Sequence, residues 1–220
     1  MKNSHKLTTV GATLLLAATG GYAQSADKFY VNVDGGAAFQ NDVTIDPAIN
    51  GPGNTIKFDT GFRAGAELGY NINRSFAVEL EVGIIRNTIN QAGNQPLSSY
   101  GANAELNEIP LLVNGIYTFQ LKGDFKPYVG VGVGMMAGIL NSSKVTGLSS
   151  NNNPTYDGTD YTFAYQAELG FKYLLNKHIN LGLAYKFTGT TDHSWTDNNI
   201  NLKTDGTMTH SIEATFTWRF

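Results

Sequence analysis

Apolar and polar residues alternate along most of the chain after residue 23, most clearly between residues 57 and 70. Phe58, Phe62 and Leu68 fall at one parity of this segment, whereas Arg63 and Glu67 fall at the other. Successive side chains of a β-strand point to opposite faces, so the segment predicts a strand with one apolar and one charged face.

The same alternation marks seven further segments. Each candidate strand has about 10 to 16 residues, longer than the ~5 to 6 of soluble strands and suited to crossing a bilayer at a tilt. After residue 23 no run of about 18 apolar residues predicts a membrane helix. The seven segments are 28–40, 75–86, 104–119, 127–139, 160–173, 179–188 and 207–220.

Short and long connections alternate between these segments. The short ones are 71–74, 120–126 and 174–178, and the long ones, rich in Asn, Gly, Ser, Thr and Asp, are 41–56, 87–103, 140–159 and 189–206. Periplasmic turns and extracellular loops alternate in this way, which predicts an all-β fold: an eight-stranded antiparallel up-and-down transmembrane β-barrel. Closure is required because unpaired edges are costly in hydrocarbon. A water-soluble barrel or sandwich is the alternative.

Aromatic residues gather near both ends of the predicted strands, as expected for girdles at the two membrane interfaces. The periplasmic set is Phe29, Tyr70, Phe76, Tyr117, Phe119, Tyr128, Phe171, Tyr173, Trp218 and Phe220. The outer set is Phe39, Phe58, Phe62, Tyr161, Phe163, Tyr185 and Phe187.

The first residues have the layout of a secretory signal peptide. Lys2 and Lys6 precede an apolar stretch, and small residues end at Ala23. The stretch is too short for a spanning helix, which favours a cleaved signal over a retained anchor. We therefore expect two parts: a cleaved signal peptide over 1–23 and an outer-membrane β-barrel domain over 24–220.

Composition excludes several kinds of function. The chain has no cysteine, so disulfides, thiolate nucleophiles and cysteine-based metal sites are impossible. Without the two signal-peptide lysines, 13 of the 15 basic residues remain against 18 acidic ones. This net charge of −5 argues against nucleic-acid binding, which depends on basic patches. No cofactor or metal site is predicted.

Three short stretches resemble the small outer-membrane β-barrel family, which includes OmpA-like and opacity-like surface proteins. They are Glu108-Ile109-Pro110-Leu111-Leu112, the glycine-alternating stretch from Lys126 to Gly134, and Phe216-Thr217-Trp218-Arg219-Phe220. The resemblance implies an outer-membrane location, and Trp218 and Phe220 resemble the family's C-terminal insertion signal. The implied partners are outer-membrane lipid and lipopolysaccharide, the barrel-insertion machinery, and a host or surface ligand at the loops.

Charged residues of both signs fall on the predicted inward faces: Arg63, Glu67, Glu79, Glu81, Glu108, Glu168, Lys172, Lys186, Glu213 and Arg219. Charges in a narrow lumen must pair, so we expect a structural ion-pair network. A narrow ion path lined by these groups is the alternative. Gly130, Gly132, Gly134 and Gly138 share one parity and are expected to leave room for long charged side chains from opposite strands.

Three kinds of function remain compatible with the sequence. The leading hypothesis is a non-enzymatic surface barrel that supports envelope integrity and offers its extracellular loops for adhesion or recognition. The first alternative is a narrow, low-conductance porin, and the second is a lipid-modifying enzyme. Only His193-Ser194 and His210-Ser211 pair a base with a nucleophile, and adjacent strand residues face opposite sides, which argues against a catalytic triad.

Overall fold

The computed structural model describes residues 28–46, 55–92, 95–96, 98, 104–142, 158–197 and 200–220. The predicted signal peptide and its cleavage site lie outside this part, so cleavage after Ala23 stays a prediction. No helix among the described residues is long and apolar enough to cross a membrane.

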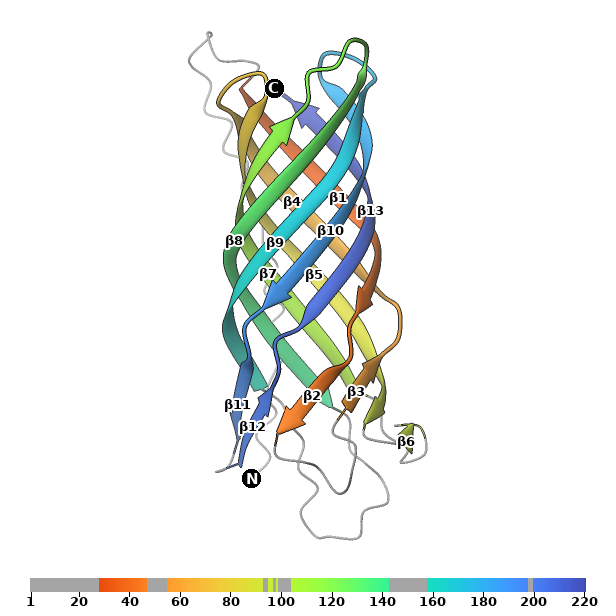
Figure 1. The fold of residues 1–220 in the computed structure, drawn as a ribbon, viewed down its shortest axis with the longest axis vertical. Coiled ribbons are helices and arrows are strands. Elements are labelled where there is room, and N and C mark those ends of the chain that lie inside the picture. Colours follow the sequence, from red (N-terminus) through yellow and green to blue (C-terminus); the bar gives the residue numbers. More distant parts are fainter. Residues whose placement is uncertain are drawn as a thin grey trace, which may run out of the picture.

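Eight long strands form a closed ring, which confirms the predicted fold class (Figure 1). All pairings around the ring are antiparallel, and β1 closes it by pairing with both β4 and β13. The long strands are β1 (Phe29–Gln40), β4 (Gly61–Asn71), β5 (Phe76–Ala92), β7 (Ala104–Thr118), β8 (Phe125–Ser142), β9 (Gly158–Leu174), β10 (Ile179–Thr190) and β13 (Met208–Arg219).

Among the described residues, five short strands lie at the loop end of the barrel, mostly where the sequence predicted loops. They are β2 (Val43–Asp46), β3 (Thr55–Phe58), β6 (Gln95–Pro96), β11 (His193–Asp197) and β12 (Ile200–Thr204). The strand predicted over 57–70 is interrupted, because β3 ends at Phe58 and β4 begins at Gly61. The predicted loops 87–103 and 140–159 also began too early, because β5 continues to Ala92 and β8 to Ser142.

Two of the short turns are closed in the same way by an asparagine. Asn73 Oδ1 accepts hydrogen bonds from the backbone N–H groups of Ser75 and Phe76, at 2.8 and 2.9 Å. Asn176 Oδ1 accepts the same pair from His178 and Ile179. Asparagine is common in such turns because its short side chain can accept hydrogen bonds from backbone N–H groups two or three residues further along the chain. These local bonds explain why the turn end is compact.

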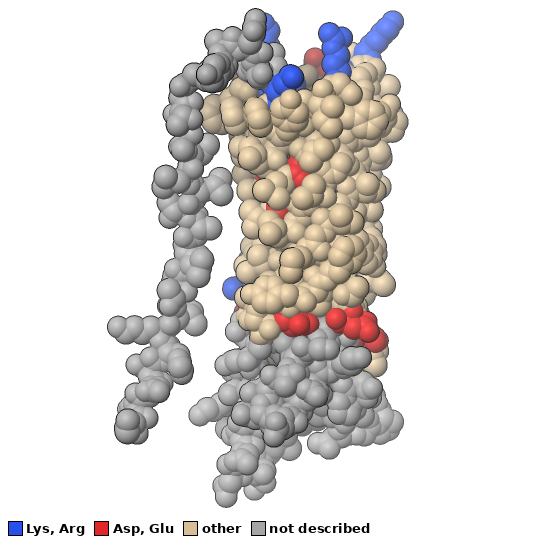
Figure 2. Space-filling view, turned by 90° about the vertical axis from the view of Figure 1, so that its left-hand side faces the viewer, with Lys and Arg blue, Asp and Glu red and all other residues tan. Residues whose placement is uncertain are grey.

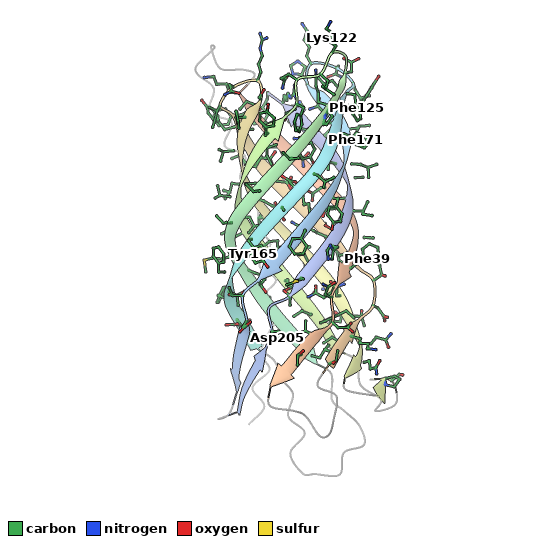
Figure 3. All side chains as sticks on the ribbon, in the orientation of Figure 1. Phe39, Lys122, Phe125, Tyr165, Phe171 and Asp205 are labelled. Carbon is green, nitrogen blue, oxygen red and sulfur yellow. The ribbon has the colours of Figure 1, made fainter. Side chains whose placement is uncertain are left out.

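The outer wall between the two ends carries few charged side chains (Figure 2), and its large exposed residues are apolar. Aromatic side chains lie near both ends of the wall, such as Phe125 and Phe171 at the turn end and Phe39 towards the loop end (Figure 3). At the turn end the rings pack in pairs, such as Phe76 with Tyr117 at 4.9 Å between centroids. Tyr128 was wrongly assigned to this girdle. Its side chain is buried in the lumen because it shares the parity of Gly130 and Gly132.

Pro110, within the family-like stretch, coincides with an interruption in the wall. The β5–β7 pairing runs to Val82 opposite Leu111 and resumes at Ile85 opposite Glu108. Proline has no N–H to donate to the ladder, which accounts for the gap. The pairing of β7 with β8 continues through this position, so the interruption affects only one side of the strand.

Candidate functional site

The centre of the lumen is occupied by hydrogen-bonded charged groups arranged around Arg63. Its guanidinium forms an ion pair with Glu81 and donates to Thr188 Oγ1 at 2.7 Å and to Gln166 Oε1 at 2.6 Å. Arg63 Nε lies 3.3 Å from Glu213 Oε1. The Arg63, Glu81 and Glu213 side chains are fully buried, and pairing limits the large cost of desolvating them.

Lys186 is the second cation of this cluster. Its Nζ lies 2.5 Å from Asp34 Oδ2, 2.9 Å from Glu67 Oε1, 3.3 Å from Glu81 Oε1 and 3.5 Å from Glu213 Oε2. The two cations thus contact four carboxyl groups contributed by β1, β4, β5 and β13. We call Asp34, Arg63, Glu67, Glu81, Lys186 and Glu213 the central cluster. It ties together opposite sides of the barrel.

Amide side chains complete the hydrogen bonding of the central cluster. Glu81 Oε2 accepts from Asn114 Nδ2 at 2.7 Å and from Gln166 Nε2 at 2.8 Å. Asn32 Nδ2 donates to Glu67 Oε2 at 2.8 Å. The bonds extend the cluster onto β7 and β9, so β1, β4, β5, β7, β9, β10 and β13 all contribute to one polar layer.

Two of the sequence-predicted lumen residues form a separate group nearer the turn end. Lys172 Nζ lies 3.8 Å from Glu79 Oε1 and stands over the rings of Tyr128 and Tyr30, at 4.6 and 5.4 Å from their centroids. Tyr30 Oη donates to Glu79 Oε1 at 2.5 Å. Cation–π contact and the ion pair together hold this buried lysine.

The remaining predicted residues are Glu108, Glu168 and Arg219. Glu108 accepts a hydrogen bond from Thr207 Oγ1 at 2.6 Å near the loop end. Glu168 is buried on β9, on the same face as Gln166, and interacts electrostatically with Lys186 and Lys172. Arg219 lines a pocket at the turn end. The ten residues therefore occupy several heights along the lumen.

Sequence reasoning missed Asp34, because the alternation of segment 28–40 was not resolved into an inner and an outer face. Its parity with Asn32 and Tyr30, both polar or amphipathic, was the available signal. It also missed two apolar clusters inside the lumen. One is Tyr30, Ala77, Ile116, Tyr128 and Ala184, and the other is Ala38, Ile85, Leu112, Met136 and Ala164.

The central cluster lies between these two apolar clusters. From the turn end to the loop end, the lumen face of β1 carries Tyr30, then Asp34, then Ala38. The lumen face of β5 carries Ala77, then Glu81, then Ile85. An eight-stranded barrel is only wide enough to be filled by side chains. On these two strands the filling is apolar, then charged, then apolar, whereas β13 carries buried polar residues along its whole lumen face.

Two glycines on the lumen face of β8 leave room for side chains, but these come from the neighbouring strands β7 and β9 and not, as predicted, from opposite strands. A Cβ at Gly130 would meet the side chains of Glu168 and Ile116, and one at Gly132 would overlap the amide of Asn114. The same device accommodates Tyr128, whose ring occupies the space over Gly170. Small residues here thus let longer side chains from neighbouring strands fill the interior.

The wall of the barrel separates His210 from Ser211. His210 Nδ1 lies 2.6 Å from Tyr185 Oη on the outer side, and its ring stacks near that of Phe187. Ser211 is fully buried in the lumen and donates to Glu213. The predicted separation of this base from its neighbour is therefore observed. The side chains of His193 and Ser194 lie outside the described part.

At the loop end, strand pairing continues beyond the barrel ring. β11 pairs with β12, β12 with β2, β2 with β3, and β3 with the end of β5. We call β2, β3, β11 and β12 the outer sheet. In Figure 1 it stands beyond the barrel wall at the end opposite the short turns and the C-terminus. Segments from three different connections are thereby joined by backbone hydrogen bonds.

Cations predominate at the turn end of the wall and acidic residues at the loop end, although Asp124 lies at the former and Arg86 at the latter (Figure 2). The loop end has a collar of acidic residues where the strands leave the ring: Asp42, Asp59, Glu105, Asp160, Asp192 and Asp205. Some of these have local partners, such as Glu105, which lies 3.9 Å from Arg86 Nε. The turn end instead carries Lys28, Arg74, Lys122, Lys126 and Lys177.

A closed eight-stranded antiparallel barrel with an apolar outer surface and a polar, packed lumen defines a small transmembrane β-barrel protein. The sequence profile described as "Outer membrane protein beta-barrel domain" matches residues 10–220. The chain belongs to this family, and it is a protein of the cell outer membrane. The predicted membership and location are thereby confirmed.

Two curated relatives cover most of the chain. The outer membrane protein PagN of Salmonella typhimurium is 24% identical over 203 residues, which cover 85% of this chain and 83% of PagN. A putative adhesin of Rickettsia bellii is 25% identical over 214 residues, covering 92% of this chain and 89% of the relative. Each alignment therefore covers most of this chain and most of the relative.

Solved structures show the same fold. Neisserial surface protein A superposes with a TM-score of 0.56 at 16% identity, covering 87% of this chain and 97% of the other. The outer membrane protein AlkL superposes with a TM-score of 0.55, also at 16% identity, covering 91% and 94%. At this identity the likeness concerns architecture alone.

Proposed function

We propose that this outer-membrane barrel is a non-enzymatic surface protein whose loop end binds a host cell or another surface, while the barrel supports envelope integrity. The observation that carries the proposal is the outer sheet, which joins β2, β3, β11 and β12 beyond the barrel wall. Binding surfaces commonly lie on loops positioned by a rigid scaffold. Backbone pairing between separate loops provides such a scaffold on the extracellular side.

The names of the relatives point in the same direction. A Rickettsia bellii relative and a Rickettsia akari relative are both described as putative adhesins, and both align over most of this chain. Their likeness supports an adhesive role for a shared architecture. Identities of 25% and 27% leave the receptor to be found by experiment.

The filled lumen favours adhesion over the porin alternative. Conduction needs a continuous open path, whereas hydrogen-bonded side chains from seven strands fill the middle of the lumen. The placement of His210 and Ser211 on opposite sides of the wall likewise argues against lipid hydrolysis by that pair.

The decisive experiment is adhesion of bacteria that display the protein. The unmodified barrel is expressed in a non-adherent Gram-negative strain, and attachment to cultured epithelial cells is counted. A variant in which residues 193–204 are replaced by a short Asn-Gly turn is compared with it. We expect the variant to lose most of the attachment because it lacks the β11–β12 hairpin of the outer sheet.

Two measurements separate loss of binding from loss of folding. Heat-modifiable electrophoretic mobility reports the folded barrel, and surface labelling reports its display. A matched control, Lys122→Gln in the turn between β7 and β8, changes the opposite end of the molecule and is expected to leave attachment unchanged. Full attachment by a folded, displayed hairpin variant would contradict the proposal.

A further inference from the structure

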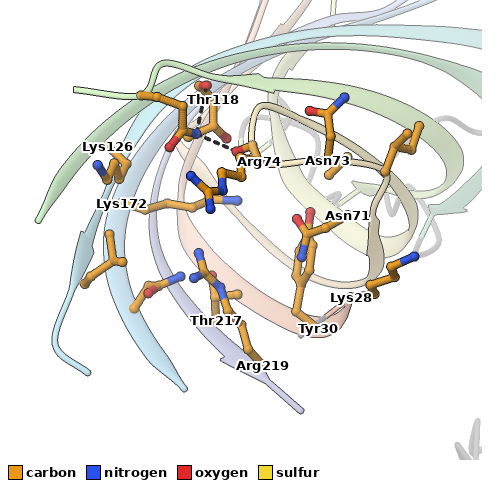
Figure 4. Close-up of a pocket in the computed structure, with 15 residues that line it drawn as sticks. Lys28, Tyr30, Asn71, Asn73, Arg74, Thr118, Lys126, Lys172, Thr217 and Arg219 are labelled. Carbon is orange, nitrogen blue, oxygen red and sulfur yellow. Dashed lines mark hydrogen bonds between the residues drawn. The ribbon is translucent and has the colours of Figure 1, made fainter. Parts of the chain in front are cut away.

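A pocket of about 380 Å³ opens at the turn end of the lumen, and it is strongly basic (Figure 4). Five of its lining residues are cationic: Lys28, Arg74, Lys126, Lys172 and Arg219. None of the fifteen residues that line it is acidic. It lies at the other end of the barrel from the outer sheet, so its role is independent of the proposed adhesion.

The floor of the pocket is built from buried groups. Lys172 is 7% exposed, and Tyr30, over which its ammonium stands, is 3% exposed. The carboxylate nearest to Lys172 among the described residues is Glu79, whose Oε1 lies 3.8 Å from Nζ, beyond hydrogen-bond length. The ammonium has three donors, so it retains capacity for an acceptor that enters the pocket.

The rim of the pocket is positioned by two turns. Gln120 Nε2 donates to the backbone oxygen of Arg74 at 2.5 Å, which ties the β4–β5 turn to the β7–β8 turn. Lys126 Nζ donates to the backbone oxygen of Leu121 at 2.5 Å, across the β7–β8 turn. Figure 4 shows Arg74, Lys126, Lys172 and Arg219 around the pocket, each from a different element.

This arrangement concentrates positive charge in one concave site that no acidic residue lines. Like charges held together in this way raise the local potential and attract an anion with more than one negative charge. Two guanidinium groups provide planar donor pairs that match phosphate oxygens, and three ammonium groups add point charges. A single carboxylate would satisfy fewer of these donors than a phosphate group.

We infer that the basic pocket at the periplasmic mouth of the barrel binds a phosphate group, on a free phosphate or on a lipid headgroup. Phosphate is the chemistry shared by both sources. The turn end of the barrel faces the periplasm and borders the inner leaflet, so either source can reach the rim.

The first test is calorimetric titration of the barrel, refolded in the phosphate-free detergent lauryldimethylamine oxide, with pyrophosphate at low salt. We expect saturable binding at one site per barrel. The double variant Arg74→Gln, Lys126→Gln is expected to bind pyrophosphate about tenfold more weakly, because two charge-assisted contacts are removed. Lys122→Gln, on the same turn but outside the pocket, is the matched control and should leave the affinity unchanged.

The second test distinguishes the lipid source. Native mass spectrometry of the barrel with phosphatidylglycerol or phosphatidylcholine counts the lipids retained by each variant. If the barrel retains lipid in a way that depends on Arg74 and Lys126 but does not bind pyrophosphate, the site binds a lipid headgroup. If it binds pyrophosphate but retains no lipid in this way, the site binds a free phosphate. Absence of both, or equal weakening by Lys122→Gln, would overturn the inference.

Discussion

Leu80 and Glu81 are neighbours on β5, yet they lie in opposite environments. Leu80 is 50% exposed on the outer wall and lies between Leu68 and Val113 of the adjacent strands. Glu81 is fully buried, and it contacts both cations of the central cluster. One residue along the same strand therefore separates a position that contacts lipid from one that requires charged partners.

The difference shows how the wall is stabilised in two distinct ways. The outer face is stable because hydrocarbon accepts apolar side chains and rejects charge, with a penalty that depends on depth. The inner face is stable because each buried ion has several partners, and removing one partner leaves another charge uncompensated. Substitutions on the two faces should therefore destabilise the barrel for opposite reasons. Adding a charge is unfavourable on the outer face, and removing one is unfavourable on the inner face.

The largest effect is expected from Arg63→Met in the lumen. The variant leaves Glu81 and Glu213 with Lys186 as their remaining cation, which should lower the free energy of unfolding by about 3–5 kcal/mol. Urea unfolding of the barrel in lipid vesicles measures this value. Adding Glu81→Gln in the same chain should restore part of it, and a loss below about 1 kcal/mol in the single variant would contradict the role of the cluster.

Leu80→Arg tests the outer face at the same height. An arginine near the bilayer midplane costs about 2–4 kcal/mol in barrels of this kind, and the same unfolding measurement should detect it. Leu121→Arg, in the exposed β7–β8 turn, is the matched control and should cost at most about 1 kcal/mol. Equal costs at the two positions would show that Leu80 does not lie in hydrocarbon.

Gly69→Ala tests how closely the lumen is packed. A Cβ at Gly69 would overlap the ring of Tyr30, which its hydrogen bond to Glu79 and its contact with Lys172 hold in place. Overpacking of this kind should destabilise the barrel by about 1–3 kcal/mol in the same assay. Gly115→Ala is the control, because its Cβ would meet only Val131 O at 3.9 Å. Similar losses of unfolding free energy in both variants would indicate that the lumen relaxes to accommodate the added methyl group.

The smallest effect is expected from Tyr185→Phe, which removes a hydrogen bond on the outer face. Tyr185 Oη lies 2.6 Å from His210 Nδ1, and its loss should cost about 0.5–1.5 kcal/mol. Tyr161→Phe removes a hydroxyl from a ring that is 68% exposed and should change stability by less than about 0.5 kcal/mol. If both variants behave alike, the Tyr185–His210 contact does not contribute to stability.

The alternation of side chains was sufficient to predict the barrel and most of its inward-facing charges. Glu79 and Glu81 on β5, and Glu168 and Lys172 on β9, point inward because strand geometry has a period of two. The same rule places Tyr128 in the lumen, although its position near a strand end is also typical of the aromatic girdle. Parity was the stronger signal at this site.

Strand structure that depends on long-range pairing was harder to predict from the sequence. The extension of β5 to Ala92 occurs because β3 and β6 provide partners for it at the loop end. The residues there are polar and resemble a loop when they are considered alone. Part of their strand structure depends on pairing with β3, which is distant in the sequence.

The sequence by itself determined the strand number, the orientation of most side chains and the division into short turns and long connections. These features follow from local periodicity and turn chemistry, which neighbouring residues specify. Only the tertiary structure decided which inward-facing charges meet, that an apolar cluster lies on either side of the central cluster, and that five cations line one pocket at the turn end. The physical reason is that strand tilt and register set the height of each side chain in the lumen, and alternation along a strand carries no information about register with distant strands.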